Sequence, residues 1–191
     1  MASHSATKLT PEQYLELERA AEYKNEYFDG EMVAMSGVSL RHSYLQTNLL
    51  GELYNAPLRH DCEVFGSSLR VRVSDRMYVY PDMSVVCGKP LLEDEYQDTL
   101  VNPVVLFEVV SPSTEKYDRG LKLRHYRTIP SLQDYILVDQ DQVRIEQYTR
   151  QDANVWTLRD YQRLEDELPL GSIGVSLSLA RIYDRVEFAA S

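Results

Sequence analysis

Apolar residues in this chain fall mostly into short runs and alternating stretches, which is the pattern of β-strands. The run VVLFEVV at 104–110 is apolar on both faces, as in a central strand covered by helices on either side. Residues 69–73 (LRVRV) alternate strictly, so one face of that strand is expected to carry Arg70 and Arg72. Further strands are predicted at 62–66, 77–88, 133–150 (two strands around an acidic turn) and 154–161.

Helical signals flank this strand-rich middle. Thr10 is a typical N-cap and Pro11 a typical first helical residue, so a helix is expected to begin there. Leucines at helical spacing predict a second helix that ends at Pro57. The Asp29-Gly30 pair predicts a tight turn between two short strands. Helices are expected at 10–23, 40–57, 118–130 and 177–188.

This order of elements predicts one domain over residues 1–191, of the α/β (α+β) class, with a central mixed β-sheet flanked by helices. A helix and a hairpin at about 10–36 form its N-terminal part. With 43% hydrophobic residues the chain can bury a sizeable core. No apolar run approaches the roughly 20 residues needed to cross a bilayer, and the N-terminal stretch has no apolar signal core, so a cytoplasmic protein is expected.

One acid, Glu108, interrupts the apolar run at 104–110. A lone ionised carboxylate in an apolar core is costly unless it is paired or holds a metal ion. Asp82 is the best candidate partner, because the spacer 88–103 is long enough to bring the two strands side by side. Two carboxylates on neighbouring strand ends repel each other unless a cation lies between them, and Mg²⁺ suits such oxygen ligands. The alternatives are a structural acid at Glu108, satisfied by arginine or backbone amides, and a turn cap at Asp82.

A lysine, Lys122, lies one turn into the helix expected after this strand, for which Asp118 is the expected N-cap. Its ammonium can reach the same strand end and stabilise developing phosphate charge, and the backbone carbonyl of Val110 can add a third oxygen ligand. Asp82, Glu108 and Lys122 together therefore indicate metal-assisted phosphodiester hydrolysis. The competing interpretation of Lys122 is an ordinary surface ion pair with Asp118, four residues away.

Other polar residues have two interpretations each. Glu31 is either a third metal-binding acid or a solvated hairpin residue. His42 either lies near the phosphate, where it orients water, or belongs to the polar surface of a helix. Arg70 and Arg72 either contact DNA or form the solvent face of an edge strand, and Arg119 is a further candidate for DNA contact.

The net charge of −10 argues against broad, nonspecific nucleic-acid binding, which rests on neutralising phosphates. The segment 111–130 nevertheless holds five basic residues against two acidic ones, so a local positive surface is compatible with the acidic total. The two cysteines, Cys62 and Cys87, have neither metal-ligand spacing nor a disulfide framework around them. Both lie in apolar runs and are interpreted as small buried hydrophobic residues.

Two segments, PDMSVV and LFEVVSPSTEKYDRGLKLRHYRTIPSLQDYILVD, together resemble a restriction-endonuclease-like family of bacterial proteins in the PD-(D/E)XK nuclease superfamily. The upstream YFDGEMVAMSG…RH fits the N-terminal pattern of that family, so the resemblance covers roughly residues 27–139. It implies a restriction-endonuclease-like core of αβββαβ type. It also implies cleavage of DNA that depends on Mg²⁺ or Mn²⁺.

The resemblance also implies roles for single residues. Asp82 and Glu108 match the two metal-binding acids of the superfamily. The superfamily lysine normally stands two residues after the second acid, where this chain has Val110. Lys122 matches the place to which the family has moved this lysine, and Lys116 is the fallback.

The leading hypothesis is therefore a metal-dependent deoxyribonuclease that hydrolyses DNA phosphodiester bonds. Two alternatives remain: a catalytically silent DNA- or protein-binding module on the same fold, and a phosphodiesterase that acts on a non-duplex substrate. The acidic net charge favours the alternatives, whereas the intact acids favour the nuclease. The long strand pair at 135–148 is of the kind that self-association often buries, so a homodimer or higher oligomer is expected.

Overall fold

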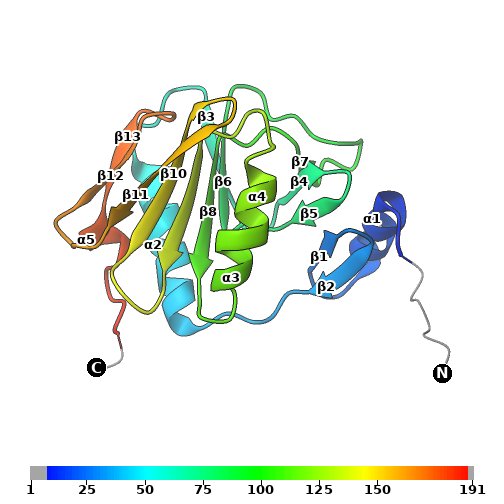
Figure 1. Cartoon of the computed structure of the whole chain (residues 1–191), viewed down its shortest axis with the longest axis horizontal. Helices are drawn as coiled ribbons and strands as arrows, with labels where there is room; N and C mark the ends of the chain where they lie inside the picture. The colour runs from blue at the N-terminus through cyan, green and yellow to red at the C-terminus, as the bar shows by residue number, and fades with distance from the viewer. Residues whose placement is uncertain (1–7, 189–191) are drawn as a thin grey trace.

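The computed structural model describes residues 8–188 and is built around a six-stranded mixed β-sheet (Figure 1). Its strand order is β11-β10-β9-β8-β6-β3, in which β8 and β9 are parallel and the other neighbours antiparallel. The predicted central strand is β8 (Val105–Val110), and all of its residues are buried. The predicted mixed sheet is therefore confirmed. The other strands are β3 (Cys62–Gly66), β6 (Met83–Cys87), β9 (Asp134–Asp139), β10 (Ile145–Asp152) and β11 (Val155–Tyr161).

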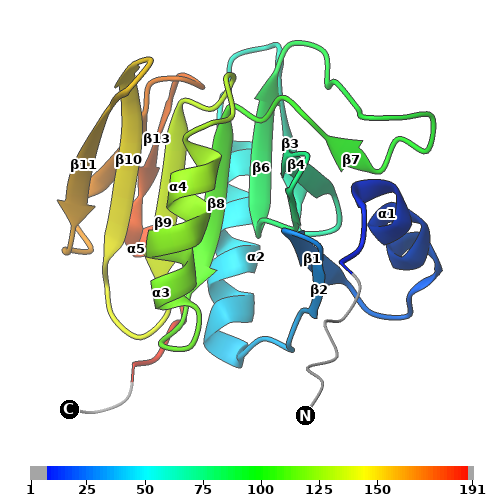
Figure 2. The same ribbon diagram turned by 45° about the vertical axis from the view of Figure 1, so that its right-hand side comes forward.

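A second sheet of five strands, in the order β2-β1-β5-β4-β7, packs on one face of the first sheet (Figure 2). It contains the predicted hairpin, in which Phe28 of β1 pairs with Glu31 of β2 across the Asp29-Gly30 turn. The sequence did not predict this second sheet as a separate unit, nor the small β12–β13 sheet. The strands of these two sheets are β1 (Asn25–Phe28), β2 (Glu31–Ala34), β4 (Arg70–Ser74), β5 (Met77–Val79), β7 (Thr99–Leu100), β12 (Glu167–Leu170) and β13 (Val175–Ser178).

Helices cover both faces of the six-stranded sheet, α2 and α5 on one face and α4 on the other (Figures 1 and 2). The Thr10 side chain caps α1 as predicted, and Gln13 completes a capping box. None of the described helices is long and apolar enough to cross a membrane. The helices are α1 (Pro11–Ala20), α2 (Leu40–Asn55), α3 (Glu115–Tyr117), the π-helix η1 (Asp118–Lys122), α4 (Leu123–Tyr126) and α5 (Leu179–Ile182).

The prediction of a single strand at 77–88 is wrong, because the chain passes from one sheet to the other within this segment. β5 ends at Val79 in the five-stranded sheet, and β6 begins at Met83 in the six-stranded sheet. Pro81 lies in the break, where its missing N–H removes a donor that a continuous ladder needs. The break places Asp82 immediately before β6, between the two sheets.

Two predicted helices also differ from the structure. The helix expected to begin at Asp118 begins at Glu115 and continues as the π-helix η1, so Asp118 is a buried residue inside it and not its N-cap. The closing helix is a single turn, α5, because the residues before it pair as β13 with β12. The N-terminal residues 1–7, which entered the prediction of location, lie outside the described residues.

Candidate active site

A cavity of about 580 Å³ lies where β6 begins and β8 ends. The β1–β2 hairpin and the segment 35–39 line one side of it, and residues 111–118 line the other. The N-terminal end of α2 and the C-terminal end of β8 are at the same end of the molecule (Figures 1 and 2). Of the residues nominated from the sequence, Asp82, Glu108, Lys122, Glu31 and His42 all line this cavity.

Asp82 is held by donors from two different elements. Its Oδ1 atom accepts hydrogen bonds from His42 Nε2 (2.9 Å) and Gln46 Nε2 (3.1 Å), both on α2. Its Oδ2 atom accepts one from the backbone N–H of Val109 on β8 (2.7 Å). β6 pairs with β8 in a register that sets Met83 opposite Phe107, so one residue further on Asp82 faces Glu108. The two acids are therefore opposite each other in the register, Asp82 at the residue before β6 and Glu108 on β8.

The prediction that the Val110 carbonyl faces this site is wrong. That oxygen accepts a hydrogen bond from Gln140 N (3.1 Å) and so points toward β9. Backbone groups alternate direction along a strand, so those of Val109 point toward β6 instead. Continuing the β6–β8 register sets Val109 opposite Pro81, which has no N–H to give. The carbonyl available next to the two acids is thus that of Val109, which also lines the cavity.

Glu108 is buried, with 5% of its surface exposed, and one of its oxygens is well satisfied. Oε1 accepts hydrogen bonds from Lys122 Nζ (2.9 Å) and Tyr126 OH (2.7 Å). Among the described residues, Oε2 has no donor. Burial raises the pKa of Glu108 to about 8, against the opposing effect of the Lys122 ammonium. Three nearby acids, Asp118, Asp82 and Glu26, add to the rise.

Lys122 is the centre of a buried cluster of charges. Its Nζ atom lies 2.9 Å from Glu108, 3.1 Å from Glu26 and 3.6 Å from Asp118. Burial alone lowers a lysine pKa, but here the three acids outweigh it and the pKa of Lys122 is raised well above its usual value. The interpretation of Lys122 and Asp118 as a surface pair is wrong, because both side chains are buried.

Glu26 is a site residue that the sequence did not reveal. It lies on β1, and besides Lys122 its carboxylate accepts a hydrogen bond from Tyr117 OH (3.3 Å). The only local signal is the alternation along the strand, which sets the side chain of Glu26 on the face opposite to that of Tyr27. Nothing in a short hairpin says which face meets the central sheet. Lys116, by contrast, is exposed and does not line the cavity.

The arginines nominated for DNA contact are engaged within the protein. Arg70 is 2% exposed and donates to Thr99, Tyr80 and Asp98, so its predicted contact with nucleic acid is wrong. β4 lies inside its sheet, with the core between the sheets on one face and α1 and the segment before β7 over Arg70 on the other. Arg72 pairs with Asp75 and Glu93. Arg119 pairs with Glu115 and Glu146.

Acidic residues outnumber basic ones in the cavity. Its acidic residues are Glu26, Glu31, Asp82, Glu108 and Asp118, and its basic ones are Lys122 and His42. In the range 8–188, no three acidic, histidine or cysteine side chains already surround one common ion position. Mg²⁺ usually takes only one or two carboxylates and keeps several waters, so Asp82, Glu108 and the Val109 carbonyl are a fitting donor set. The Oε2 atom of Glu108, which has no protein donor among the described residues, supports this fit.

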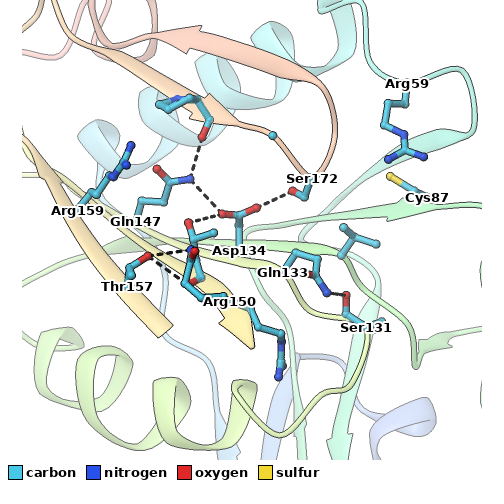
Figure 3. A pocket seen from close by; sticks show the side chains of 15 residues that line it. Arg59, Cys87, Ser131, Gln133, Asp134, Gln147, Arg150, Thr157, Arg159 and Ser172 are labelled. Atoms are coloured by element: carbon cyan, nitrogen blue, oxygen red, sulfur yellow. Dashed lines mark hydrogen bonds between the residues drawn. The ribbon is translucent and has the colours of Figure 1, made fainter. Parts of the chain in front are cut away.

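A second cavity, of about 590 Å³, lies at the opposite ends of the same strands (Figure 3). Asp134 is buried at its centre, where its carboxylate accepts hydrogen bonds from Ser172, Gln147 and Thr149. Both oxygens of Asp134 are thus satisfied by neutral groups of the protein. Arg150, at the rim, donates to four backbone carbonyls between residues 127 and 153. This network is therefore structural, and the candidate chemistry lies at the first cavity.

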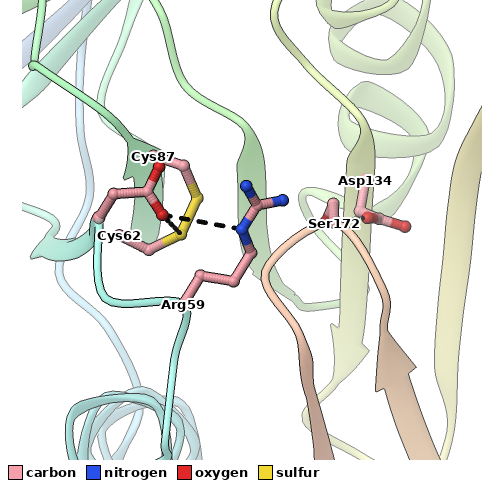
Figure 4. The surroundings of a disulfide bond; sticks show 6 residues. Arg59, Cys62, Cys87, Asp134 and Ser172 are labelled. Carbon is pink, nitrogen blue, oxygen red and sulfur yellow. Dashed lines mark hydrogen bonds and ion pairs between the residues drawn. A yellow bond between two sulfur atoms is a disulfide. The ribbon is translucent and has the colours of Figure 1, made fainter.

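Beside this second cavity the two cysteines form a disulfide, which corrects the prediction of two free buried thiols (Figure 4). Cys62 on β3 and Cys87 on β6 are direct partners in the antiparallel register. They are 25 residues apart in the sequence, so only the strand register brings them together. Both residues are half-buried, at the end of β6 that is remote from Asp82.

A family model and two related proteins each match most of this chain. A family model described as "Uma2: Putative restriction endonuclease" matches residues 11–180. An uncharacterized protein, slr1290, from Synechocystis sp. (strain ATCC 27184 / PCC 6803 / Kazusa) is 39% identical, over 98% of this chain and 100% of its own length. A second uncharacterized protein from the same organism, sll1609, is 35% identical over 80% of this chain and 86% of its own length.

A solved structure has the same fold. The crystal structure of a "putative nuclease belonging to DUF820" from Anabaena variabilis ATCC 29413 matches with a TM-score of 0.74. The match covers 92% of this chain and 97% of that one, at 20% sequence identity. The fold class predicted from the sequence is therefore confirmed, together with the resemblance to restriction endonucleases.

Proposed function

Because the chain belongs to the Uma2 family of putative restriction endonucleases, we propose that it is a metal-dependent nuclease that hydrolyses DNA phosphodiester bonds in the cavity around Asp82 and Glu108. One observation carries this proposal. Two acids from neighbouring strand ends face one cavity, and a buried lysine lies within hydrogen-bond distance of one of them. Two carboxylates side by side repel each other, and a divalent cation between them would relieve that repulsion.

The residues that would hold Mg²⁺ or Mn²⁺ are Asp82, Glu108 and the backbone carbonyl of Val109. A bound divalent ion would polarise a phosphoryl oxygen and lower the pKa of water. Asp82 is fixed in orientation by its three donors, whereas Glu108 keeps Oε2 free of protein donors in the described residues. The protein thus contributes one rigid and one available carboxylate.

Lys122 is the residue that we assign to the role of the displaced superfamily lysine. Its ammonium is fixed between three carboxylates and lines the cavity, so it is placed to stabilise negative charge on a phosphate. The π-helix η1 supplies this placement, since π-bulges change which side chains face inward on a helix. Lys116, the fallback from the sequence, is exposed and does not line the cavity, so we assign the role to Lys122.

A second candidate function, cleavage of a non-duplex substrate, is favoured by the surface around the cavity. Duplex binding relies on lysines and arginines that neutralise phosphates, yet Arg70, Arg72 and Arg119 are buried or paired with acids. Beside the acids, Val33 and Val38 are each 56% exposed and line the same cavity. An apolar wall of this kind suits unpaired bases better than a phosphate backbone.

A cleavage assay tests both candidates. The full chain is incubated in Mn²⁺ with a supercoiled plasmid and with a single-stranded oligonucleotide, and again with EDTA. We expect Mn²⁺-dependent cleavage by the wild type and by the exposed control Asp184→Asn, and none by Asp82→Asn. Cleavage of the oligonucleotide alone would select the second candidate. If neither substrate is cleaved in a metal-dependent way, the catalytically silent binding module is the hypothesis that remains.

We also propose that the protein forms a homodimer through the edge strand β11. This strand ends the six-stranded sheet, and its Val155 and Leu158 side chains are more than half exposed. Exposed apolar edge strands pair readily with another chain. Sedimentation equilibrium at micromolar concentration should give about twice the single-chain mass of 22.1 kDa, and Leu158→Lys should shift it toward one chain. A wild-type mass of one chain would count against the dimer.

A further inference from the structure

Two polar residues of α2, His42 and Gln46, lie on the helix face that packs against the central sheet. They stand one turn apart, on the same face as Leu45 and Leu49, which are completely buried. A polar group in such a position is costly unless it forms hydrogen bonds. Both side chains form a hydrogen bond with the same acceptor, Oδ1 of Asp82, through Nε2 of His42 (2.9 Å) and Nε2 of Gln46 (3.1 Å).

We propose that His42 and Gln46 are positioning residues that orient the Asp82 carboxylate for a divalent cation, an inference that rests on the proposed function. A carboxylate has about four lone-pair sites. His42, Gln46 and the N–H of Val109 occupy three of them, so one direction is left for a cation. In this proposal His42 acts through Asp82, a role that differs from both interpretations of it drawn from the sequence.

The position of α2 is itself well defined. Its leucines pack in the same core as Met83 and Val109, the residues that directly follow Asp82 and Glu108. At its N-terminus, the Ser39 side chain accepts a hydrogen bond from the His42 N–H (3.1 Å) and also bonds to Gln140 (2.9 Å). Because the helix is anchored at both places, its position brings the two donors to Asp82.

The competing interpretation is that the two donors only stabilise the Pro81-Asp82 turn. The two roles differ in what a substitution changes. Loss of a residue that orients a metal ligand typically weakens metal affinity about 10- to 100-fold. Loss of a turn contact lowers the stability of the protein and leaves the affinity for metal unchanged.

The test is a calorimetric titration of the full chain with Mn²⁺, together with thermal unfolding in EDTA. His42→Phe removes the donor and keeps a ring of similar size, so Mn²⁺ should bind about 10- to 100-fold more weakly. His42→Gln keeps a donor nitrogen, so its affinity should lie within a few-fold of the wild type. Gln46→Met should also weaken binding, and the exposed control Thr47→Ala should not.

Each outcome decides the inference. If the wild type binds Mn²⁺ and both His42→Phe and Gln46→Met bind it equally well, the inference is overturned and the proposed function stands. If His42→Gln is as weak as His42→Phe, the donor is not what matters and the inference is again overturned. If the wild type binds no Mn²⁺ at millimolar concentration, both fail. Should His42→Phe not fold, Gln46→Met decides by the same criterion, because Asp82 keeps its other two donors.

Discussion

Replacing Lys122 by methionine is expected to lower the free energy of unfolding by about 3–5 kcal/mol, because removing one partner of a buried ion pair leaves the other charge uncompensated. Here three partners are left, Glu26, Glu108 and Asp118, of which Glu108 and Asp118 are almost completely buried. Urea unfolding followed by circular dichroism measures the effect. Lys116→Met is the matched control, since Lys116 is exposed and should change stability little.

The same substitution should also lower cleavage about 10²- to 10⁴-fold at a temperature where the variant is folded, which is the usual contribution of a positioned acid–base or charge-stabilising group. The stability loss and the loss of cleavage are separate readouts. A stability change of under about 1 kcal/mol would mean that Lys122 behaves as a surface lysine in solution. Unchanged cleavage with a large stability loss would make Lys122 a structural residue only.

Glu108→Gln is expected to abolish Mn²⁺ binding and cleavage, and yet to make the protein more stable at neutral and higher pH. The folded-state pKa of Glu108 is about 8, above its ordinary value of 4.5. A raised pKa means that the folded state favours the protonated acid. The stability from this preference is fully present below pH 4.5 and is lost as the pH rises toward 8.

Glutamine cannot ionise, so the variant escapes this loss. The difference in unfolding free energy between variant and wild type should therefore grow from pH 4.5 to pH 8, reaching on the order of 3–5 kcal/mol at most. Urea unfolding at a series of pH values in EDTA measures it. Glu63→Gln, on the exposed face of β3, is the control and should show no such growth. If the free energy of unfolding changes with pH in the same way in the wild type and in Glu108→Gln, Glu108 is not a buried ionisable acid in solution.

Much of the fold could be predicted because its elements carry strong local signals. The fully apolar run around Glu108 marks a central strand, and Thr10 with Pro11 marks a helix start. The pairing of Asp82 with Glu108 was also within reach, since one acid in a buried strand needs a partner. The sequence could not show where a strand changes sheet. The break at Pro81 and the carbonyl of Val109 opposite it were therefore missed.

The parts of the site that were missed depend on long-range placement. Glu26 becomes a site residue only because the hairpin packs against the end of β8, and nothing local encodes that contact. Lys122 was assigned to the site from the sequence, but its α-helical spacing from Asp118 left a surface ion pair as the alternative, which the π-helix η1 with both residues buried rules out. Arg70 followed a strictly alternating pattern, but α1 and the segment before β7 cover the face on which it lies.

One signal was present and not used. Polar residues at 42 and 46 interrupt an otherwise leucine-rich helical face, in the same way that Glu108 interrupts an apolar strand. A buried helix face that keeps two donors needs an acceptor nearby. The two interruptions, in different elements, together indicate one polar site between the helix and the strand ends.

The most direct test of the central claim is a crystal of the full chain soaked in Mn²⁺ and measured for anomalous scattering. We predict one strong anomalous peak in the cavity, within ligand distance of an oxygen of Asp82, of Glu108 Oε2 and of the Val109 carbonyl oxygen. The peak should be absent from Glu108→Gln crystals treated in the same way. A wild-type crystal with no peak between Asp82 and Glu108 at millimolar Mn²⁺ would contradict the assignment of this cavity as a metal-dependent nuclease site.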